Sequence, residues 1–401
     1  MMIPPALREL RFAAYWCGIV VSLSGHMMGI VVRGWLVNEL THSSVWLGGV
    51  YAMVGLPGLV LGPFAGALVD RVDRGKVLLV TQALHGLNAL LLGITILTGS
   101  ISPPLLLLFA LMAGSIGSFD WTVRLAIVPK LVRAESLDSA VALSSGAWIL
   151  AGVLGPAVAG VLLPRIGAAG CFFVTSAAFL PSVLTAFRRA AIPPEPSKPG
   201  DSWLQSTVQG YRYILGRRLL RTLLLLEGIP VVFGLPFTTL FPILAERAAA
   251  GSNEETLGLL HSAVGVGAIL GATFSSMSLR TAKRGRALLV SAGAFGAGLM
   301  TFAVSKPFLV LLALLVAIGA VESIFSTLNA TLVQRITDEA YRGRVMSVYN
   351  LPWGITPVGG LSLGLVAKAF DPGVAIAIHG GLIALLVVGI ACASPELRRT
   401  A

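Results

Sequence analysis

Hydrophobic residues along the chain fall into twelve long blocks, separated by short clusters of Gly, Pro and charged residues. A helix needs about 20 apolar residues to cross the roughly 30 Å of hydrocarbon in a lipid bilayer. The blocks therefore predict twelve transmembrane helices, near residues 12–39, 45–69, 76–99, 103–128, 139–164, 167–187, 221–246, 257–280, 287–304, 307–333, 344–368 and 373–393.

The composition favours a membrane protein and excludes several other classes. Of the 401 residues, 56% are hydrophobic and 12% are charged, about half the charged fraction of a soluble domain. The helices and their loops leave no room for a separate catalytic domain. The net charge of +11 is scattered in small clusters, which argues against a nucleic-acid partner. The three cysteines are Cys17, Cys171 and Cys392. Their spacing indicates neither a disulfide nor a metal site, and we expect no cofactor.

The positions of Lys and Arg predict the orientation. Positively charged loops stay on the cytoplasmic side of a membrane. If both termini are cytoplasmic, 23 of the 29 basic residues lie in inner segments. The apolar stretch from Phe12 to about Leu40 is too long for the core of a signal peptide, so it is interpreted as the first helix. We predict a multi-pass protein of the inner or plasma membrane.

Weak internal matches predict a duplicated fold. Ile116–Asp120 resembles Ile318–Glu322 at an offset of 202 residues, and the surroundings of Gly155–Pro156 and Gly66 recur at nearly the same offset. Transporters often place the substrate site between such repeats. We therefore predict an all-α fold of two pseudo-symmetric six-helix bundles. The predicted bundles are residues 1–187 and 221–401, joined by a cytoplasmic linker, residues 188–220, that leads into an amphipathic surface helix over 211–221.

Ionisable residues inside the predicted helices mark a candidate site. Each costs at least about 2.5–3.5 kcal/mol at the centre of a bilayer, so it normally faces a cavity or a partner. They gather on the first helix of each predicted three-helix unit, which predicts a polar cavity lined by the first, fourth, seventh and tenth helices. The candidates for substrate binding or proton coupling are His26, Arg33, Asp120, Arg124, Glu227 and Glu322.

These residues allow more than one interpretation. Asp120 and Arg124 are one helical turn apart and can form an ion pair. The pair is either part of a substrate site or only neutralises its own two charges. Glu227 and Glu322 have no obvious local partner, so each is a candidate to bind a proton or cation as access alternates, or to make a structural hydrogen bond. Histidines 85, 261 and 379 lie on helices expected to be peripheral, and we interpret them as packing residues.

The loop after the second predicted helix carries a dense motif of small and charged residues. Gly66 would allow two helices to approach closely. Asp70 could accept hydrogen bonds from the start of a neighbouring helix, and Arg71 and Arg74 could pair across the loop. Such a latch could hold one conformation of a transporter closed.

This loop, Gly66 to Lys76, resembles the G-x-x-x-D-R-x-G-R-R/K signature of the major facilitator superfamily, with Asp73 and Gly75 as departures. The stretch Gln334–Ser347 and the Phe119–Asp120 to Arg124 segment resemble the branch of enterobactin-exporter-like and macrolide or multidrug exporters. The resemblance covers about Leu7 to Val388. It implies gating roles for Arg342, Gly343 and Arg344, and helix bending at Gly155 and Pro156, which partly match the antiporter motif of the superfamily.

The resemblance implies a secondary transporter, not an enzyme, that exports amphipathic small molecules such as drugs or siderophores. We expect alternating access with protons as the coupling ion, in a monomer surrounded by lipid. No phosphate-binding loop for ATP occurs, and neither do the common motifs of intramembrane hydrolases. The alternatives are a proton-coupled uptake permease on the same scaffold and a membrane receptor or assembly factor that transports nothing.

Overall fold

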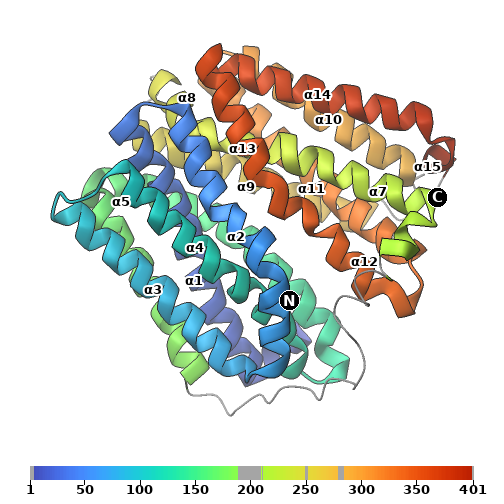
Figure 1. Ribbon diagram of the computed structural model, residues 1–401, viewed down its shortest axis with the longest axis horizontal. Helices are drawn as coiled ribbons and strands as arrows, with labels where there is room; N and C mark the ends of the chain where they lie inside the picture. Colours follow the sequence, from blue (N-terminus) through green and yellow to red (C-terminus); the bar gives the residue numbers. More distant parts are fainter. Residues whose placement is uncertain (1–3, 188–208, 210, 249–251, 279–283, 400–401) are drawn as a thin grey trace. The chain divides into compact units, whose positions relative to one another are not determined.

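The computed structural model describes residues 4–187, 209, 211–248, 252–278 and 284–399. All regular elements within these residues are helical, as Figure 1 shows. Contacts divide the chain into two units. Unit 1 contains Met1–His42, Leu56–Ser197 and Ala249–Ser262, and unit 2 contains Ser43–Gly55, Lys198–Ala248 and Ala263–Ala401. The predicted boundaries of two bundles and a linker stay a prediction, and the linker residues 188–208 and 210 lie outside the described part.

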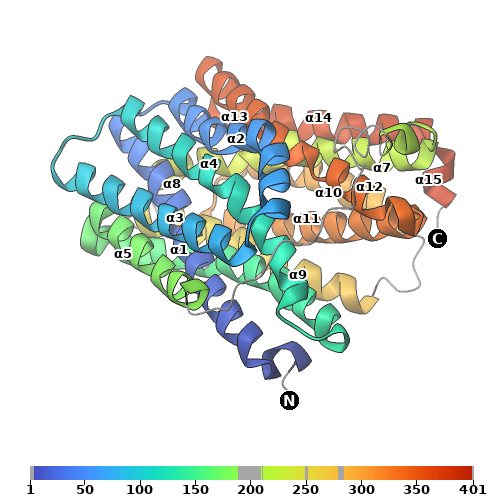
Figure 2. The ribbon, with the colours of Figure 1, turned by 60° about the horizontal axis from the view of Figure 1, so that its bottom comes forward.

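Unit 1 is built from long helices. They are α1 (Leu10–Thr41), most of α2 (Ser44–Arg71), α3 (Arg74–Leu97), α4 (Pro103–Ile127), α5 (Leu137–Phe187) and the start of α9 (Asn253–Ser278). Helix α5 packs along both α1 and α3, and Figures 1 and 2 show the three side by side. Phe12 of α1 and Phe172 of α5 are fully buried in this unit.

Unit 2 contains the remaining helices. They are α7 (Arg218–Ile229), α8 (Phe241–Ala248), α10 (Arg284–Val304), α11 (Phe308–Ile336), α12 (Arg342–Tyr349), α13 (Leu351–Ala369), α14 (Pro372–Ala393) and α15 (Pro395–Arg399), with most of α9. Helix α10 packs between α14 and α11. The first part of α2 also belongs to this unit, because the Ser44 hydroxyl donates to the Gly364 carbonyl of α13 at 2.8 Å.

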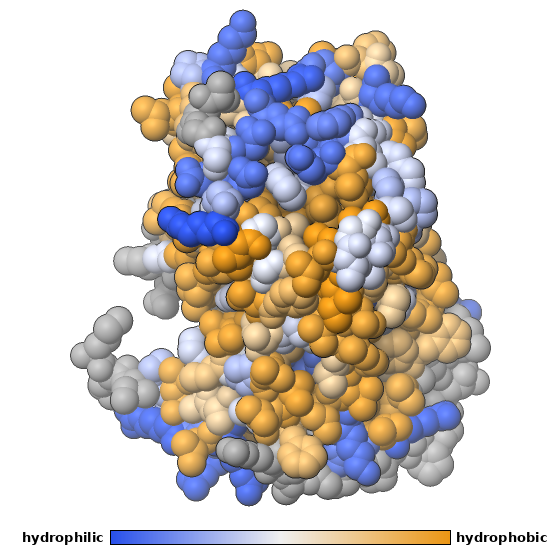
Figure 3. All heavy atoms as spheres, turned by 90° about the vertical axis from the view of Figure 1, so that its left-hand side faces the viewer, coloured by the Kyte–Doolittle hydropathy of each residue, from blue (hydrophilic) through white to orange (hydrophobic). Residues whose placement is uncertain are grey.

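Ten helices of the described part are long and apolar enough to cross a membrane. One of them, Ala134–Phe187, has 54 residues, which would make a straight helix about 80 Å long. It is broken at Gly167, whose φ of 66° is left-handed, so it divides near the predicted junction of 139–164 and 167–187. On the face drawn in Figure 3, hydrophobic side chains cover the middle and hydrophilic ones gather toward the two ends. The count of twelve crossings itself stays a prediction.

The prediction of one continuous helix over 221–246 is wrong in the middle of this range. After α7 the chain forms a π-helical turn at Pro230–Gly234 and a 3-10 turn at Leu235–Leu240 before α8. Prolines 230, 236 and 242 cause the irregularity, because each lacks a backbone N–H and its ring crowds the preceding turn. The freed carbonyl of Phe233 lies 3.2 Å from Nδ1 of His379 on α14. This contact fits the packing role predicted for His379.

Two further boundaries differ from the predicted helices. The predicted helix over 344–368 is divided into α12 and α13 at Asn350, two residues before Pro352. The predicted surface helix over 211–221 is helical at 211–215 and is interrupted at Gly216 and Arg217 before α7 begins. In both places a helix-breaking residue follows an otherwise helical pattern.

An ion pair at one end of unit 2 provides a test of pH dependence. Arg247 of α8 donates from Nη1 to Oδ2 of Asp371 at 2.5 Å, and Oδ1 of Asp371 accepts from the backbone N–H of Gly373 at 2.8 Å. Asp371 lies just before the apolar span of α14. The hydrogen bond from Arg247 holds the pKa of the Asp371 carboxyl below its usual range.

We expect Asp371→Asn to lower the free energy of unfolding by less than about 1 kcal/mol at neutral pH, because both partners are about half exposed. A lowered folded-state pKa stabilises the protein above the unfolded pKa of about 3.9, and this contribution is lost as the pH falls through the folded value. The difference from the wild type should therefore disappear in acid. Unfolding in detergent at neutral and acidic pH measures it. A difference that grows in acid would contradict the assignment.

Candidate functional site

An ion pair on α4 forms the centre of the site in unit 1. Arg124 donates from Nε to Oδ2 of Asp120 at 2.5 Å, as the spacing of one turn predicted, and both residues are more than 90% buried. Oδ1 of Asp120 accepts two further hydrogen bonds from α3, at 2.9 Å from the Thr81 hydroxyl and at 2.6 Å from the Gln82 amide. The Asp120 carboxylate is therefore fully neutralised and held in place by two helices.

A cavity of about 210 Å³ opens beside this pair. Its walls come from four helices of unit 1: α1, α3, α4 and α5. The lining side chains are Leu23, His26, His85, Gly117, Asp120, Trp121, Arg124, Trp148 and Phe179. Most of the wall is aromatic or aliphatic, and few polar groups converge on it, which is the usual character of a small-molecule site.

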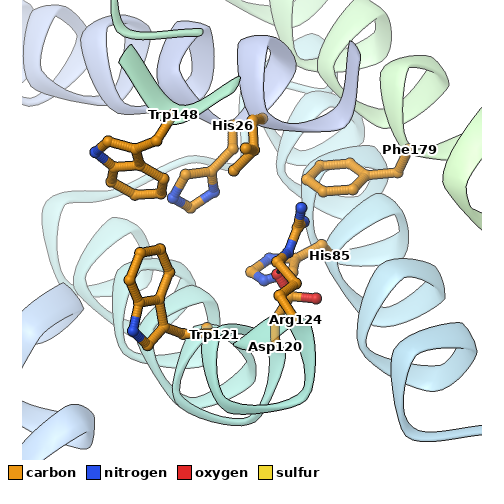
Figure 4. Close-up of a pocket in the computed structure, with 9 residues that line it drawn as sticks. His26, His85, Asp120, Trp121, Arg124, Trp148 and Phe179 are labelled. Carbon is orange, nitrogen blue, oxygen red and sulfur yellow. Dashed lines mark hydrogen bonds and ion pairs between the residues drawn. The ribbon is translucent and has the colours of Figure 1, made fainter. Parts of the chain in front are cut away.

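Aromatic rings surround the cavity in two groups, which Figure 4 shows on either side of His26. The Trp121 and Trp148 rings meet edge to face with centroids 5.2 Å apart. On the other side the His85 ring stacks on Phe179 at 5.3 Å, and His26 meets His85 edge to face at 5.5 Å. These rings offer flat apolar faces to a ligand, whereas Arg124 offers a charged donor.

Two arginine groups of unit 1 retain hydrogen-bonding capacity. Nη1 of Arg124 is buried and makes no hydrogen bond within the described residues. The same holds for Nε of Arg33, which lies two turns beyond His26 on α1 with its guanidinium 5.9 Å from the Phe172 ring centroid. With one carboxylate and two guanidinium groups, this region carries a net positive charge. A ligand with accepting oxygens would satisfy the donor on Arg124.

The structure corrects the interpretation of His85 and adds residues that the sequence reasoning missed. His85 was predicted to be a peripheral packing residue, but it lines the cavity, because α3 packs against α4 and α5 and so turns this face inward. Thr81 and Gln82 were missed, although two polar residues within an apolar helix were a usable signal. The cavity-lining rings of Trp148 and Phe179 gave no signal of their own, because each lies in an ordinary apolar block.

The two acidic candidates of the second half lie in unit 2. Glu227 of α7 is 2% exposed and accepts a hydrogen bond from the Asn329 amide of α11 at 2.7 Å. Glu322, also on α11, makes no hydrogen bond within the described residues. Asn329 was missed by the sequence reasoning, although it lies seven residues after Glu322 and therefore on the same side of the helix.

Comparison with known proteins identifies the family. The sequence profile of transmembrane secretion effectors, a group within the major facilitator superfamily, matches residues 4–401. The chain belongs to this family. The chain is also 28% identical over 406 residues to the enterobactin exporter EntS of Shigella boydii serotype 18, a match that covers 98% of this chain and 93% of the relative. EntS of Escherichia coli O1:K1 is 28% identical over 407 residues, with the same shares covered.

Solved transporters share the fold of this protein. The nucleoside transporter NupG superposes with a TM-score of 0.74 at 12% identity, over 96% of this chain and 99% of that one. A D-xylose–proton symporter superposes with a TM-score of 0.73 at 16% identity, with the same coverage. The protein is therefore an all-α, multi-pass membrane protein of the major facilitator fold. It is a transporter and not an enzyme.

The latch predicted for the loop after α2 can be described only in part. A Cβ added to Gly66 would have no atom within 4 Å. The prediction that two helices approach closely at this residue is therefore wrong. Arg71 is exposed at the end of α2 and Arg74 is buried at the start of α3. The Asp70 side chain lies outside the described part. Asp73 caps α3, because its Oδ1 accepts from the Lys76 backbone N–H at 3.0 Å.

Close approach is instead required at Gly155. A Cβ there would lie 2.6 Å from both the Ser24 carbonyl oxygen and Met27 Cβ of α1. Pro156 follows it inside α5 and is also buried, and the helix continues past both residues until Gly167. Gly155 thus sets the distance between α5 and α1, and a bending role for Gly155 and Pro156 stays a prediction.

One of the predicted gating residues after α11, Arg344, belongs to a stack of four side chains. We call it the Arg–Tyr stack, and its members are Arg217, Tyr213, Tyr341 and Arg344. The two tyrosine rings stack with centroids 4.3 Å apart. The Arg217 guanidinium lies 4.3 Å from the Tyr213 centroid, and that of Arg344 lies 5.5 Å from the Tyr341 centroid. Arg342 and Gly343 are exposed next to the stack.

Hydrogen bonds reinforce the Arg–Tyr stack. Arg217 pairs with Asp338 at 2.6 Å, and the Asp338 backbone N–H donates to the Tyr213 hydroxyl at 2.9 Å. Arg344 donates to the Gln209 side chain at 2.9 Å. The segment before α7 is therefore fastened to the segment between α11 and α12. Gating by Arg342, Gly343 and Arg344 stays a prediction.

We expect Tyr341→Leu to destabilise unit 2 by about 1–2 kcal/mol, because it removes one ring stack and one cation–π contact. Tyr211→Leu is the matched control, since Tyr211 is exposed two residues before Tyr213 and is not part of the stack. Thermal unfolding in detergent compares the two variants. Equal melting temperatures for both would show that the stack adds nothing to stability.

Proposed function

We propose that this transporter exports amphipathic small molecules of the drug or siderophore type across the cytoplasmic membrane, by alternating access and in exchange for protons. The observation that carries the proposal is the cavity in unit 1, where aromatic rings surround the free donor of Arg124. Aromatic faces suit the apolar part of such a molecule, and the guanidinium suits its oxygen atoms. The relatedness to enterobactin exporters favours export over uptake.

The proposal includes the predicted arrangement in the membrane. The protein acts as a monomer with both termini in the cytoplasm, in accordance with the distribution of Lys and Arg. Asp70, Arg71, Arg74, Arg342 and Arg344 then lie on the cytoplasmic side, where they can close or open the path to the cavity.

Inside-out membrane vesicles test the proposal. Vesicles that contain the protein are acidified within, and enterobactin or the dye rhodamine 6G is added outside. We expect both probes to accumulate, and accumulation to stop when the pH gradient is dissipated. Vesicles that contain Trp148→Ala should accumulate less, because one cavity wall is removed. If the same gradient instead drives either probe out of such vesicles, the result would favour the uptake permease and overturn the proposal.

A further inference from the structure

Two acidic residues and two polar residues form a cluster in unit 2, in which Glu322 is partly exposed and the other three residues are buried. Its members are Glu227, Glu322, Asn329 and Tyr349. Asn329 is fully buried and donates both to the Glu227 carboxylate at 2.7 Å and to the Leu223 carbonyl at 3.1 Å. Its Oδ1 atom is buried without a hydrogen-bond partner in the described part of the chain. The Asn329 amide therefore retains an acceptor oxygen without a hydrogen bond in the described residues, on the same amide group that contacts Glu227.

Tyr349 of α12 contributes a hydroxyl group that contacts the carboxylates. It is 5% exposed and lies beside both Glu227 and Glu322. Its buried hydroxyl interacts with the Glu227 carboxylate and with Ser326. A protonated carboxylic acid is a donor that could use the free Asn329 oxygen or the Tyr349 oxygen, whereas an ionised carboxylate could accept from the Tyr349 hydroxyl. The cluster can therefore accommodate both protonation states.

No basic side chain of the described part offsets these two carboxylates. The groups that face them are Asn329 and Ser326 of α11 and Tyr349 of α12, none of which carries a positive charge. Glu227 and Glu322 are also close enough to repel each other when both are ionised. Two uncompensated negative charges in a low-dielectric site strongly favour binding of one positive charge.

The internal repeat of the sequence explains why the two halves differ in charge at matching positions. Asp120 and Glu322 occupy matching positions in the repeat, and the residue four places later is Arg124 in the first half and Ser326 in the second. In unit 1 the arginine permanently neutralises the carboxylate. In unit 2 serine stands in its place, so the positive charge has to come from solution.

We propose that Glu227, Glu322, Asn329 and Tyr349 form the coupling-ion site and hold one proton between the two carboxylates. The inference rests on the proposed function. In it, unit 1 binds the substrate and unit 2 binds the proton. Binding places the proton on one carboxylate oxygen, and release leaves both carboxylates ionised, which the repulsion between them drives when the site opens to a less acidic side. Glu322, which makes no hydrogen bond with any described residue, is the primary carrier, and Asn329 and Tyr349 are positioning residues.

Infrared difference spectroscopy tests the site without any transported substrate. In the full-length protein, a pH change should alter the carbonyl stretch of a protonated carboxyl group. We expect Glu322→Gln to abolish this signal, and Asn329→Ala to shift its frequency because the hydrogen bonding of the acid changes. Glu135→Gln, which changes an exposed glutamate of unit 1, should leave the signal intact. A full signal in Glu322→Gln would overturn the assignment.

Vesicle transport separates this inference from the proposed function. The readout is the ratio of rhodamine 6G accumulation with and without an imposed pH gradient. We expect a ratio well above one for the wild type and for Glu135→Gln, and a ratio of one for Glu322→Gln. A wild-type ratio in Glu322→Gln would refute the proton site and leave the proposed export standing. A ratio of one in the wild type would refute proton antiport, and accumulation driven by a sodium gradient at equal pH would assign the site to sodium instead.

Discussion

Arg124→Leu is expected to abolish transport and to cost about 3–5 kcal/mol of stability, because it leaves the Asp120 carboxylate buried without its partner. The carboxylate would keep only the hydrogen bonds from Thr81 and Gln82, which are too few to replace a full charge. The same change also removes the free guanidinium donor from the cavity. Rhodamine 6G accumulation in vesicles and chemical unfolding in detergent measure the two effects separately.

A matched control and a double variant sharpen this prediction. Arg247→Leu breaks an ion pair of similar length that is about half exposed, and it should cost less than about 1 kcal/mol. Asp120→Leu combined with Arg124→Leu should recover most of the lost stability but none of the transport, because no buried charge remains. The assignment fails if Arg124→Leu is no less stable than Arg247→Leu.

Gly155→Ala is expected to destabilise unit 1 by about 1–3 kcal/mol, as overpacking of a close contact usually does. The added Cβ would meet the backbone of α1, with the Ser24 carbonyl oxygen at 2.6 Å and the Met28 nitrogen at 2.8 Å. Backbone atoms cannot rotate away as the end of a side chain can, so the two helices have to separate. The larger Gly155→Val should express poorly.

Gly152 supplies the control, since it lies on α5 only three residues earlier. A Cβ at Gly152 would have nothing within 4 Å, so Gly152→Ala should be neutral or should stabilise by up to about 1 kcal/mol through helix propensity. Thermal unfolding of the two alanine variants in the same detergent provides the comparison. Similar melting temperatures would show that α5 does not depend on close contact with α1 at Gly155.

Much of the helical scaffold could be predicted from apolar blocks alone, because a bilayer demands long hydrophobic helices. The prediction was wrong where local backbone chemistry overrides hydrophobicity. Three prolines, at residues 230, 236 and 242, convert part of one predicted helix into π and 3-10 turns. The block pattern cannot reveal such a change, since the side chains remain apolar throughout.

The candidate site could be predicted only where its chemistry lies within one helix. Asp120 and Arg124 are four residues apart, so their pairing follows from helix geometry. His85 and Phe179 are 94 positions apart in the chain yet stack at 5.3 Å, and nothing local in either block indicates a partner. The error at Gly66 has the same origin, because a glycine signals close approach only when another helix is actually there.

The contact between His379 and the Phe233 carbonyl constrains how the sequence can vary. A carbonyl that a proline-rich turn leaves open within lipid needs a donor from elsewhere. Variants that keep prolines 230 and 236 should accept asparagine or glutamine at position 379 but reject leucine. If those prolines were replaced by residues with a backbone N–H, the histidine would become dispensable. Substitutions at the prolines and at position 379 should therefore occur together during evolution.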